Sequence, residues 1–92
     1  MEKIIIKRVN KNPKEPYLLD IDTSKITDMS GLFIPGGNGH DNYNYIEILD
    51  LSNWDVSNVT NMHSMFYMLN SVKEINISAW DVSNVTQMFY MF

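Results

Sequence analysis

The sequence contains no cysteine, which excludes disulfide bonds and thiolate metal ligands as sources of stability. It also lacks a long apolar run, because the N-terminal run Ile4–Ile6 lies between Lys3 and Lys7. We therefore expect neither a signal peptide nor a membrane span. If Met1 is the true start, the expected location is the cytoplasm of a host cell; for an excised fragment it is the cell surface.

Basic residues are few beyond the N-terminus. Residues 1–14 carry a net charge of +4, whereas residues 15–92 carry −8, giving −4 for the chain. An acidic surface repels phosphates and suits a basic protein partner, so we expect no direct nucleic-acid binding. The apolar fraction of 45% in 92 residues predicts one folded domain with a modest core.

The main feature of the sequence is an internal repeat. The segment Trp54–Phe66 is answered by Trp80–Phe92 at an offset of 26 residues, and a divergent copy occupies Ile21–Phe33. Leu49-x-Leu51 and Ile75-x-Ile77 alternate as strands do, and later apolar residues such as Val59 and Met62 fall at helical spacing. Each repeat is therefore expected to contain a strand, a corner and a helical return, and the strands in 46–51 and 72–77 are expected to pair in parallel.

This pattern predicts an α/β repeat fold, a short leucine-rich-repeat solenoid of about three repeats. Residues 1–20 contain two strand-like runs around a turn-forming stretch, so we expect a β-hairpin cap there. A divergent repeat with a Gly- and Asn-rich insertion follows at 21–45, a full repeat at 46–71 and an incomplete repeat at 72–92. Met29, Met62 and Met88 are expected in the core.

The segment Leu51–Met62, followed by Met65 and Phe66, closely resembles the BspA-like leucine-rich repeat family. The resemblance is good over 46–92 and weaker over 21–33. It implies a bacterial surface protein or lipoprotein with many repeats that acts in adhesion and protein binding. This chain has fewer repeats, lacks a lipidation cysteine and has Leu69 where the family often has Cys, which opposes the surface-adhesin role.

Three aspartates recur at one repeat position, where stacking would place them roughly 5 Å apart. A glycosidase pair or a calcium ladder could use such carboxylates, but a corner in which each Asp accepts backbone N–H groups is favoured, because every repeat needs that corner. These residues are Asp22, Asp55 and Asp81. The segment Gly36–Asn44 matches one calcium-binding nonapeptide, yet such motifs bind calcium as consecutive copies, so a flexible insertion is favoured.

Catalytic chemistry finds little support in the sequence. His40 and His63 have no ligand or nucleophile partners at suitable spacing, and neither a nucleophile elbow nor a phosphate-binding loop is present. We therefore expect no enzyme activity, no cofactor and no metal. The seven methionines at helical positions indicate core packing more than a pliable binding surface.

Two regions are the predicted protein-binding sites. The insertion offers aromatic and acidic side chains of the kinds that anchor interfaces, and the C-terminal end lacks a polar cap, which also predicts self-association there. The predicted site residues are Asp41, Tyr43, Tyr45, Glu47, Phe89, Tyr90 and Phe92.

Two functions are compatible with these features. The first is a small intracellular protein-binding module of phage type, an inhibitor similar to an anti-CRISPR protein that covers a basic surface of a nucleic-acid-handling protein. The alternative is a fragment of a bacterial surface adhesin of the BspA-like family.

Overall fold

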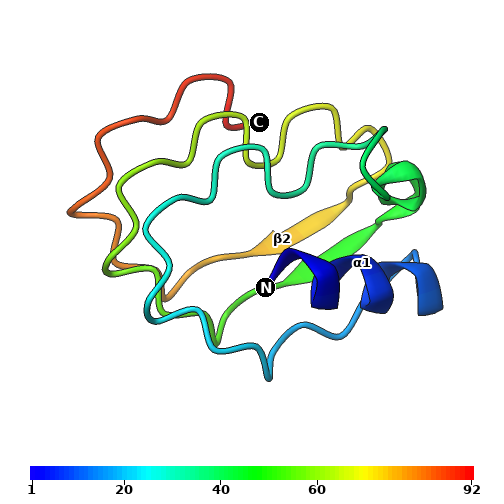
Figure 1. The fold of residues 1–92 in the computed structure, drawn as a ribbon, viewed down its shortest axis with the longest axis horizontal. Coiled ribbons are helices and arrows are strands. Elements are labelled where there is room, and N and C mark those ends of the chain that lie inside the picture. Colours follow the sequence, from blue (N-terminus) through cyan, green and yellow to red (C-terminus); the bar gives the residue numbers. More distant parts are fainter.

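The computed structural model describes all residues, 1–92, and shows a chain that winds in successive coils (Figure 1). Its regular elements are α1 (Glu2–Lys11), the 3-10 helix η1 (Asp41–Tyr45) and the short strands β1 (Ile48–Asp50) and β2 (Glu74–Asn76). Turns and extended segments make up the remainder. Neither helix has the length and hydropathy that a membrane-spanning helix requires.

The coils lie in parallel register. β1 pairs with β2 so that Leu49 faces Ile75, which confirms the predicted parallel pairing of 46–51 with 72–77. On the return side, parallel bridges join Asn61 to both Asp28 and Gln87. The offset of 26 residues therefore holds on both sides of the coil.

The first coil begins earlier than expected. The carbonyl of Lys14 accepts the N–H groups of Glu47 and Ile48, just as the carbonyl of Glu47 accepts those of Lys73 and Glu74. We therefore define coil 1 as residues 14–46, coil 2 as 47–72 and coil 3 as 73–92. Pro16, which is buried, occupies the position of Leu49, and its missing N–H explains why coil 1 has no regular strand.

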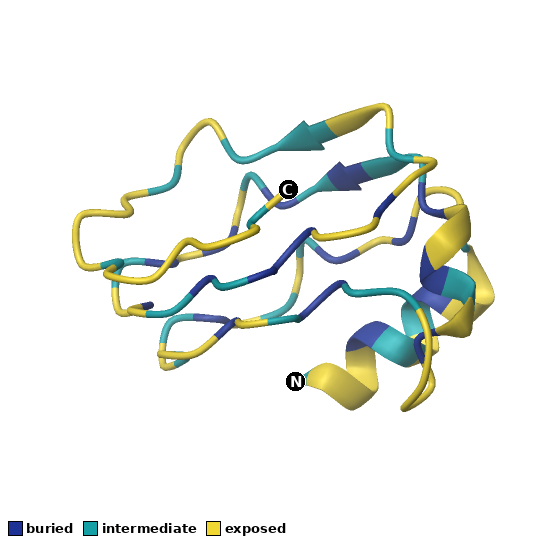
Figure 2. Ribbon diagram, turned by 90° about the horizontal axis from the view of Figure 1, so that it is seen from above, coloured by how far each residue is buried: buried dark blue, intermediate teal, exposed yellow.

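The core runs through the middle of coils 1 and 2. Seventeen buried apolar residues form one cluster, and those that repeat along the stack include Leu49, Leu51, Val59, Met62 and Met65, all fully buried. In Figure 2 the buried segments lie inside, whereas β2 and the rest of coil 3 are partly or fully exposed. Met88 was predicted to be a core residue, but it is 43% exposed because no further coil covers it.

The predicted β-hairpin at residues 1–20 is wrong, because residues 2–11 form α1. Ile5 and Val9 are fully buried at the i, i+4 spacing of one helix face, whereas Ile4 is exposed. Glu2 in the first turn and Lys11 in the last complement the helix dipole. The helix lies over the first coil and covers that end of the core (Figure 1).

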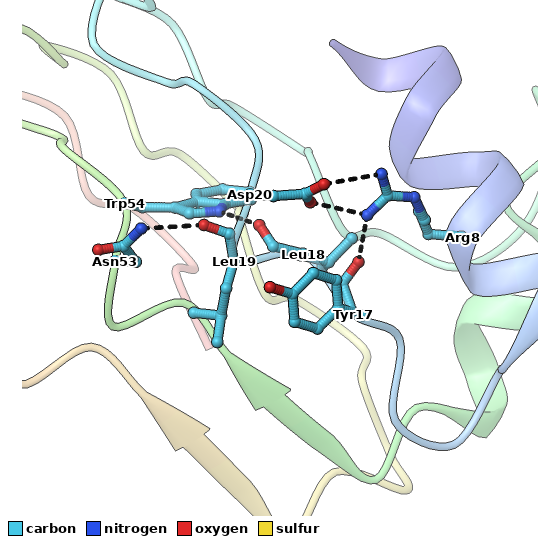
Figure 3. Close-up of polar contacts among 7 residues, drawn as sticks. All are labelled: Arg8, Tyr17, Leu18, Leu19, Asp20, Asn53 and Trp54. Atoms are coloured by element: carbon cyan, nitrogen blue, oxygen red, sulfur yellow. Dashed lines mark hydrogen bonds and ion pairs between the residues drawn. The ribbon is translucent and has the colours of Figure 1, made fainter.

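Side-chain contacts hold α1 in place. The Arg8 guanidinium donates to both carboxylate oxygens of Asp20, at 2.8 and 3.2 Å, and to the Tyr17 carbonyl at 2.8 Å (Figure 3). Glu2 Oε1 lies 2.8 Å from Nε2 of the buried His40. The first contact joins the helix to the start of coil 1, and the second joins it to the insertion.

The expected helical returns after each corner are irregular turns instead. Ser64 and Met68 have φ values of 57° and 67°, and a left-handed residue interrupts a right-handed helix. The backbone N–H groups bond to the neighbouring coil rather than along a helix; Met62 N–H, for example, donates to the Gln87 carbonyl at 2.8 Å.

Candidate protein-binding surface

The recurring aspartates belong to the corners. Asp22 and Asp55 each accept the backbone N–H and the hydroxyl of the serine two residues later, and Asp81 accepts the N–H of Ser83. This confirms the favoured interpretation of these carboxylates. Hydrogen bonds from these serines lower the pKa of all three aspartates. Oδ1 of each aspartate is thus held in its own corner.

Side chains also connect each coil to the one before it. The indole N–H of Trp54 donates to the Leu18 carbonyl at 2.8 Å, and that of Trp80 donates to the Leu51 carbonyl at 3.0 Å. The Trp54 contact is drawn in Figure 3. Asparagine and threonine donors repeat the arrangement through the pairs Asn58–Ser24, Asn84–Ser57, Thr60–Thr27 and Thr86–Thr60.

The insertion places Tyr43 in the core rather than on the surface. Tyr43 is fully buried, and its ring stacks on His40 with centroids 4.2 Å apart. Burial, and secondarily the Glu2 carboxylate, raise the pKa of the Tyr43 hydroxyl. Tyr43 is therefore unavailable as an interface anchor, and that prediction is corrected: the ring lies in the core, with its centroid 6.2 Å from that of the Phe33 ring.

The other predicted residues in and next to the insertion are at least partly exposed. Asp41 and Tyr45 are exposed on η1, and Tyr45 has 60% of its surface accessible. Glu47 is half-buried and pairs with Lys73 across coils 2 and 3 at 3.2 Å. No three His, Cys, Asp or Glu side chains meet in a group that could hold a metal ion.

Coils 2 and 3 bring together an aromatic cluster that we call the aromatic patch, formed by His63, Tyr67, Phe89 and Tyr90. The Tyr90 ring lies 5.7 Å from Tyr67 and 6.1 Å from His63, and the Phe89 ring lies 6.2 Å from His63. Phe89 and Tyr90 are 71% and 68% exposed. Sequence reasoning selected these two and missed His63 and Tyr67.

The backbone at Tyr90 is unusual for a tyrosine. Gly31, Ser64 and Tyr90 occupy the same position in successive coils, and their φ values are 63°, 57° and 53°. A non-glycine residue in this left-handed region costs about 1–2 kcal/mol. Coil 1 uses glycine there, whereas coil 3 holds a large and exposed ring in the same conformation. Since core burial does not explain that ring, Tyr90 stands out as a candidate recognition residue.

Phe92 belongs to a different surface. Its ring stacks on Phe66 at 5.4 Å, and Phe66 stacks on Phe33 at 5.6 Å, so Phe92 continues the aromatic column of the core. Phe92 is 69% exposed because its outer side is uncovered. Of the predicted C-terminal site residues, Phe89 and Tyr90 therefore belong to the aromatic patch, whereas Phe92 belongs to the uncovered end of the core.

Comparison with known proteins gives a single finding. A family model described as "Mycoplasma protein of unknown function, DUF285" matches residues 5–92. Neither a curated protein nor a solved structure matches the chain.

Proposed function

We propose that this chain, which belongs to the DUF285 family, is a non-enzymatic protein-binding module built as a stack of leucine-rich repeats. The observation that carries the proposal is the aromatic patch. Exposed Tyr and Phe side chains grouped on adjacent coils provide the large and rigid contact area on which interface hot spots are built.

The parallel register supports the repeat part of the proposal. A strand, a corner and a return recur every 26 residues in coils 2 and 3, and the Trp, Asn and Thr side chains make equivalent bonds in each. Repeat stacks present long surfaces on which positions in register lie side by side. These features support the BspA-like resemblance.

The backbone of Tyr90 supports a binding role for the patch. Stability alone favours glycine at this position, as in coil 1. A tyrosine that is both left-handed and two-thirds exposed is better explained by a contact with another molecule. The exposed Tyr45 and Asp41 on η1 form a second candidate contact region.

The partner that we propose has a basic surface. Residues 15–92 carry −8, and Asp22, Asp55 and Asp81 form an exposed acidic row along the stack. Electrostatic attraction of this kind accelerates association and weakens as ionic strength rises.

The family match favours the adhesin alternative over an anti-CRISPR-like inhibitor. The family description names Mycoplasma and gives no inhibitory role, so only small size and negative charge support the inhibitor. We therefore propose a repeat module of an adhesin-type bacterial protein that acts at the cell surface.

The test compares affinities for a protein captured from the surface fraction of host cells. The patch variant Phe89→Ser/Tyr90→Asn removes both rings, and asparagine tolerates the left-handed backbone. The control is Tyr17→Ser, which removes an aromatic ring of similar exposure, 60%, far along the chain. A hot spot is worth about 2 kcal/mol or more, so the patch variant should bind at least about tenfold more weakly.

Two further measurements test separate parts of the proposal. Tyr45→Ser tests η1, and raising the salt concentration from about 50 to about 500 mM tests the electrostatic part. A partner that binds the patch variant and the original chain equally well would refute the role of the aromatic patch. Salt-independent binding would refute the basic partner.

A further inference from the structure

The insertion near the end of coil 1 contains the one asparagine that directly precedes a glycine, in the pair Asn38-Gly39. Both residues are exposed, and their φ values of 55° and 88° lie in the left-handed region. The pair forms the tip of a turn that hydrogen bonds close at residues 36–40. Solvent therefore reaches the Asn38 amide from outside the fold.

The polar groups of this pair are free. The Asn38 side chain and the Gly39 N–H make no hydrogen bond within the chain. By contrast, the side-chain amides of Asn53, Asn58 and Asn84 donate to backbone carbonyls of the preceding coil. No hydrogen bond of Gly39 has to break before its nitrogen can turn towards the neighbouring amide.

We infer that Asn38 is a site of spontaneous deamidation in which the backbone nitrogen of Gly39 is the nucleophile. This nitrogen attacks Cγ of Asn38. An N–Cγ bond forms, the Cγ–Nδ2 bond breaks, and Nδ2 leaves as ammonia with the proton given up by the Gly39 N–H. Water then opens the resulting succinimide ring at either carbonyl carbon. One product is an aspartyl residue, and the other is an isoaspartyl residue whose backbone runs through Cβ and Cγ.

The glycine distinguishes Asn38 from the other exposed asparagines. Gly39 has no Cβ, so its nitrogen can approach the neighbouring side chain closely and its backbone can rotate at little steric cost. Asn44 and Asn70 are also exposed and also lack a side-chain hydrogen bond, but larger residues, Tyr45 and Ser71, follow them. These two asparagines are therefore internal controls for the reaction.

The isoaspartyl product lengthens the backbone by one atom inside a turn that is closed at both ends. The Gly36 N–H donates to the His40 carbonyl at 3.2 Å, and the His40 N–H donates to the Gly37 carbonyl at 3.0 Å. On the side of α1 there is little free space, because a Cβ added to Gly39 would lie 3.3 Å from Cδ1 of Ile6. The longer backbone therefore displaces His40.

His40 transmits this displacement to α1. Its buried ring donates from Nδ1 to the Ile34 carbonyl at 2.9 Å, and its Nε2 lies 2.8 Å from Oε1 of Glu2 on the helix. Both contacts depend on where the His40 backbone lies. The isoaspartyl product thus loosens the contact between the insertion and α1, whereas the aspartyl product keeps the original backbone length and preserves it. The inference is independent of the aromatic patch.

The first experiment incubates the full chain at mildly alkaline pH and follows each asparagine by peptide mass spectrometry. Asn38 should deamidate at least about tenfold faster than Asn44 or Asn70, because the glycine nitrogen meets a lower steric barrier. Asn38→Gln should remove the fast reaction, since the longer side chain would have to close a less favourable six-membered ring. Similar rates at the three asparagines of the folded chain would overturn the assignment of the site.

The second experiment measures hydrogen exchange of the α1 amides. The deamidated chain is separated from the unreacted chain by its additional negative charge and compared with Asn38→Asp, which has the same charge and a normal backbone. We expect at least about fivefold faster exchange in α1 of the deamidated chain, since a looser contact lowers the free energy of local opening. Asn38→Asp should exchange like the original chain. Equal exchange in all three proteins would overturn the effect on α1, as would equally fast exchange in Asn38→Asp.

Discussion

Trp54 donates its indole N–H to the backbone carbonyl of Leu18, 2.8 Å away, and thereby joins the second coil to the first. The ring is only 3% exposed and stacks on Phe33 with centroids 6.0 Å apart. The Trp54 side chain thus fills space in the core while its buried indole N–H is hydrogen-bonded. The next repeat has the same arrangement at Trp80, whose ring is only half-buried.

Trp54→Ala should destabilise the chain by about 3–5 kcal/mol, because it leaves a cavity and removes the hydrogen bond from the indole to the Leu18 carbonyl. Trp54→Phe keeps most of the volume and should cost less. Urea unfolding followed by circular dichroism measures both, and Trp80→Ala is the matched control. An equal or greater loss at Trp80 would show that burial does not govern these two positions.

Ser64→Gly should stabilise the chain. Ser64 has a φ of 57°, the conformation that Gly31 adopts in coil 1. Relief of about 1–2 kcal/mol of backbone strain exceeds the roughly 0.5–1 kcal/mol entropic cost of glycine, leaving a gain of about 0.5–1 kcal/mol. The check is the midpoint of thermal unfolding, with Ser57→Gly as a control outside the left-handed column. A lower midpoint for Ser64→Gly would contradict this assignment of strain.

Acid should weaken the corners below about pH 4. Hydrogen bonds from the Ser52 hydroxyl and N–H lower the pKa of Asp50 below its ordinary value of 3.8. A lowered folded-state pKa contributes stability that is complete above the unfolded value and is lost as the pH falls through the folded value. Unfolding midpoints should therefore fall as the pH drops below 3.8.

Asp50→Asn is the matched test of this pH dependence. Asn76 occupies the equivalent position in coil 3 and accepts the same two bonds from Ser78, so asparagine preserves the turn. The variant should lose little stability at neutral pH, and it should lose less than the original chain between about pH 4 and pH 2. An unchanged acid dependence would show that Asp50 does not contribute to it.

The repeat was predictable from the sequence, and its ends were not. The 26-residue offset predicted the parallel register of Leu49 with Ile75, because identical corners return the chain to the same place. The prediction of a strand at the N-terminus was wrong because three consecutive isoleucines favour a strand. In the structure only Ile5 of the three is fully buried, at helical spacing from Val9. The first repeat was predicted to begin at residue 21, later than coil 1 begins in the structure. The reason is that Pro16 stands where the later coils have the Leu or Ile of the strand.

The candidate site was only partly predictable. Residue type identified Phe89 and Tyr90, whose exposure the structure shows, but the same reasoning chose Tyr43, which is buried beside His40. Nothing local distinguishes a core tyrosine from a surface one in an insertion without periodicity. His63 could have been found, because it stands 26 residues before Phe89 and therefore beside it in the stack.

The aromatic patch depends on the register of coils 2 and 3, and a disulfide cross-link tests that register most directly. The chain has no native cysteine, and Asn61 and Gln87 form a parallel bridge, close enough for a disulfide. Asn61→Cys/Gln87→Cys should oxidise to an intramolecular disulfide and raise the unfolding midpoint. Asn61→Cys/Ser83→Cys, displaced by roughly 13 Å of extended chain, should not. Efficient cross-linking of the displaced pair, or none of the bridged pair, would contradict the register and with it the aromatic patch.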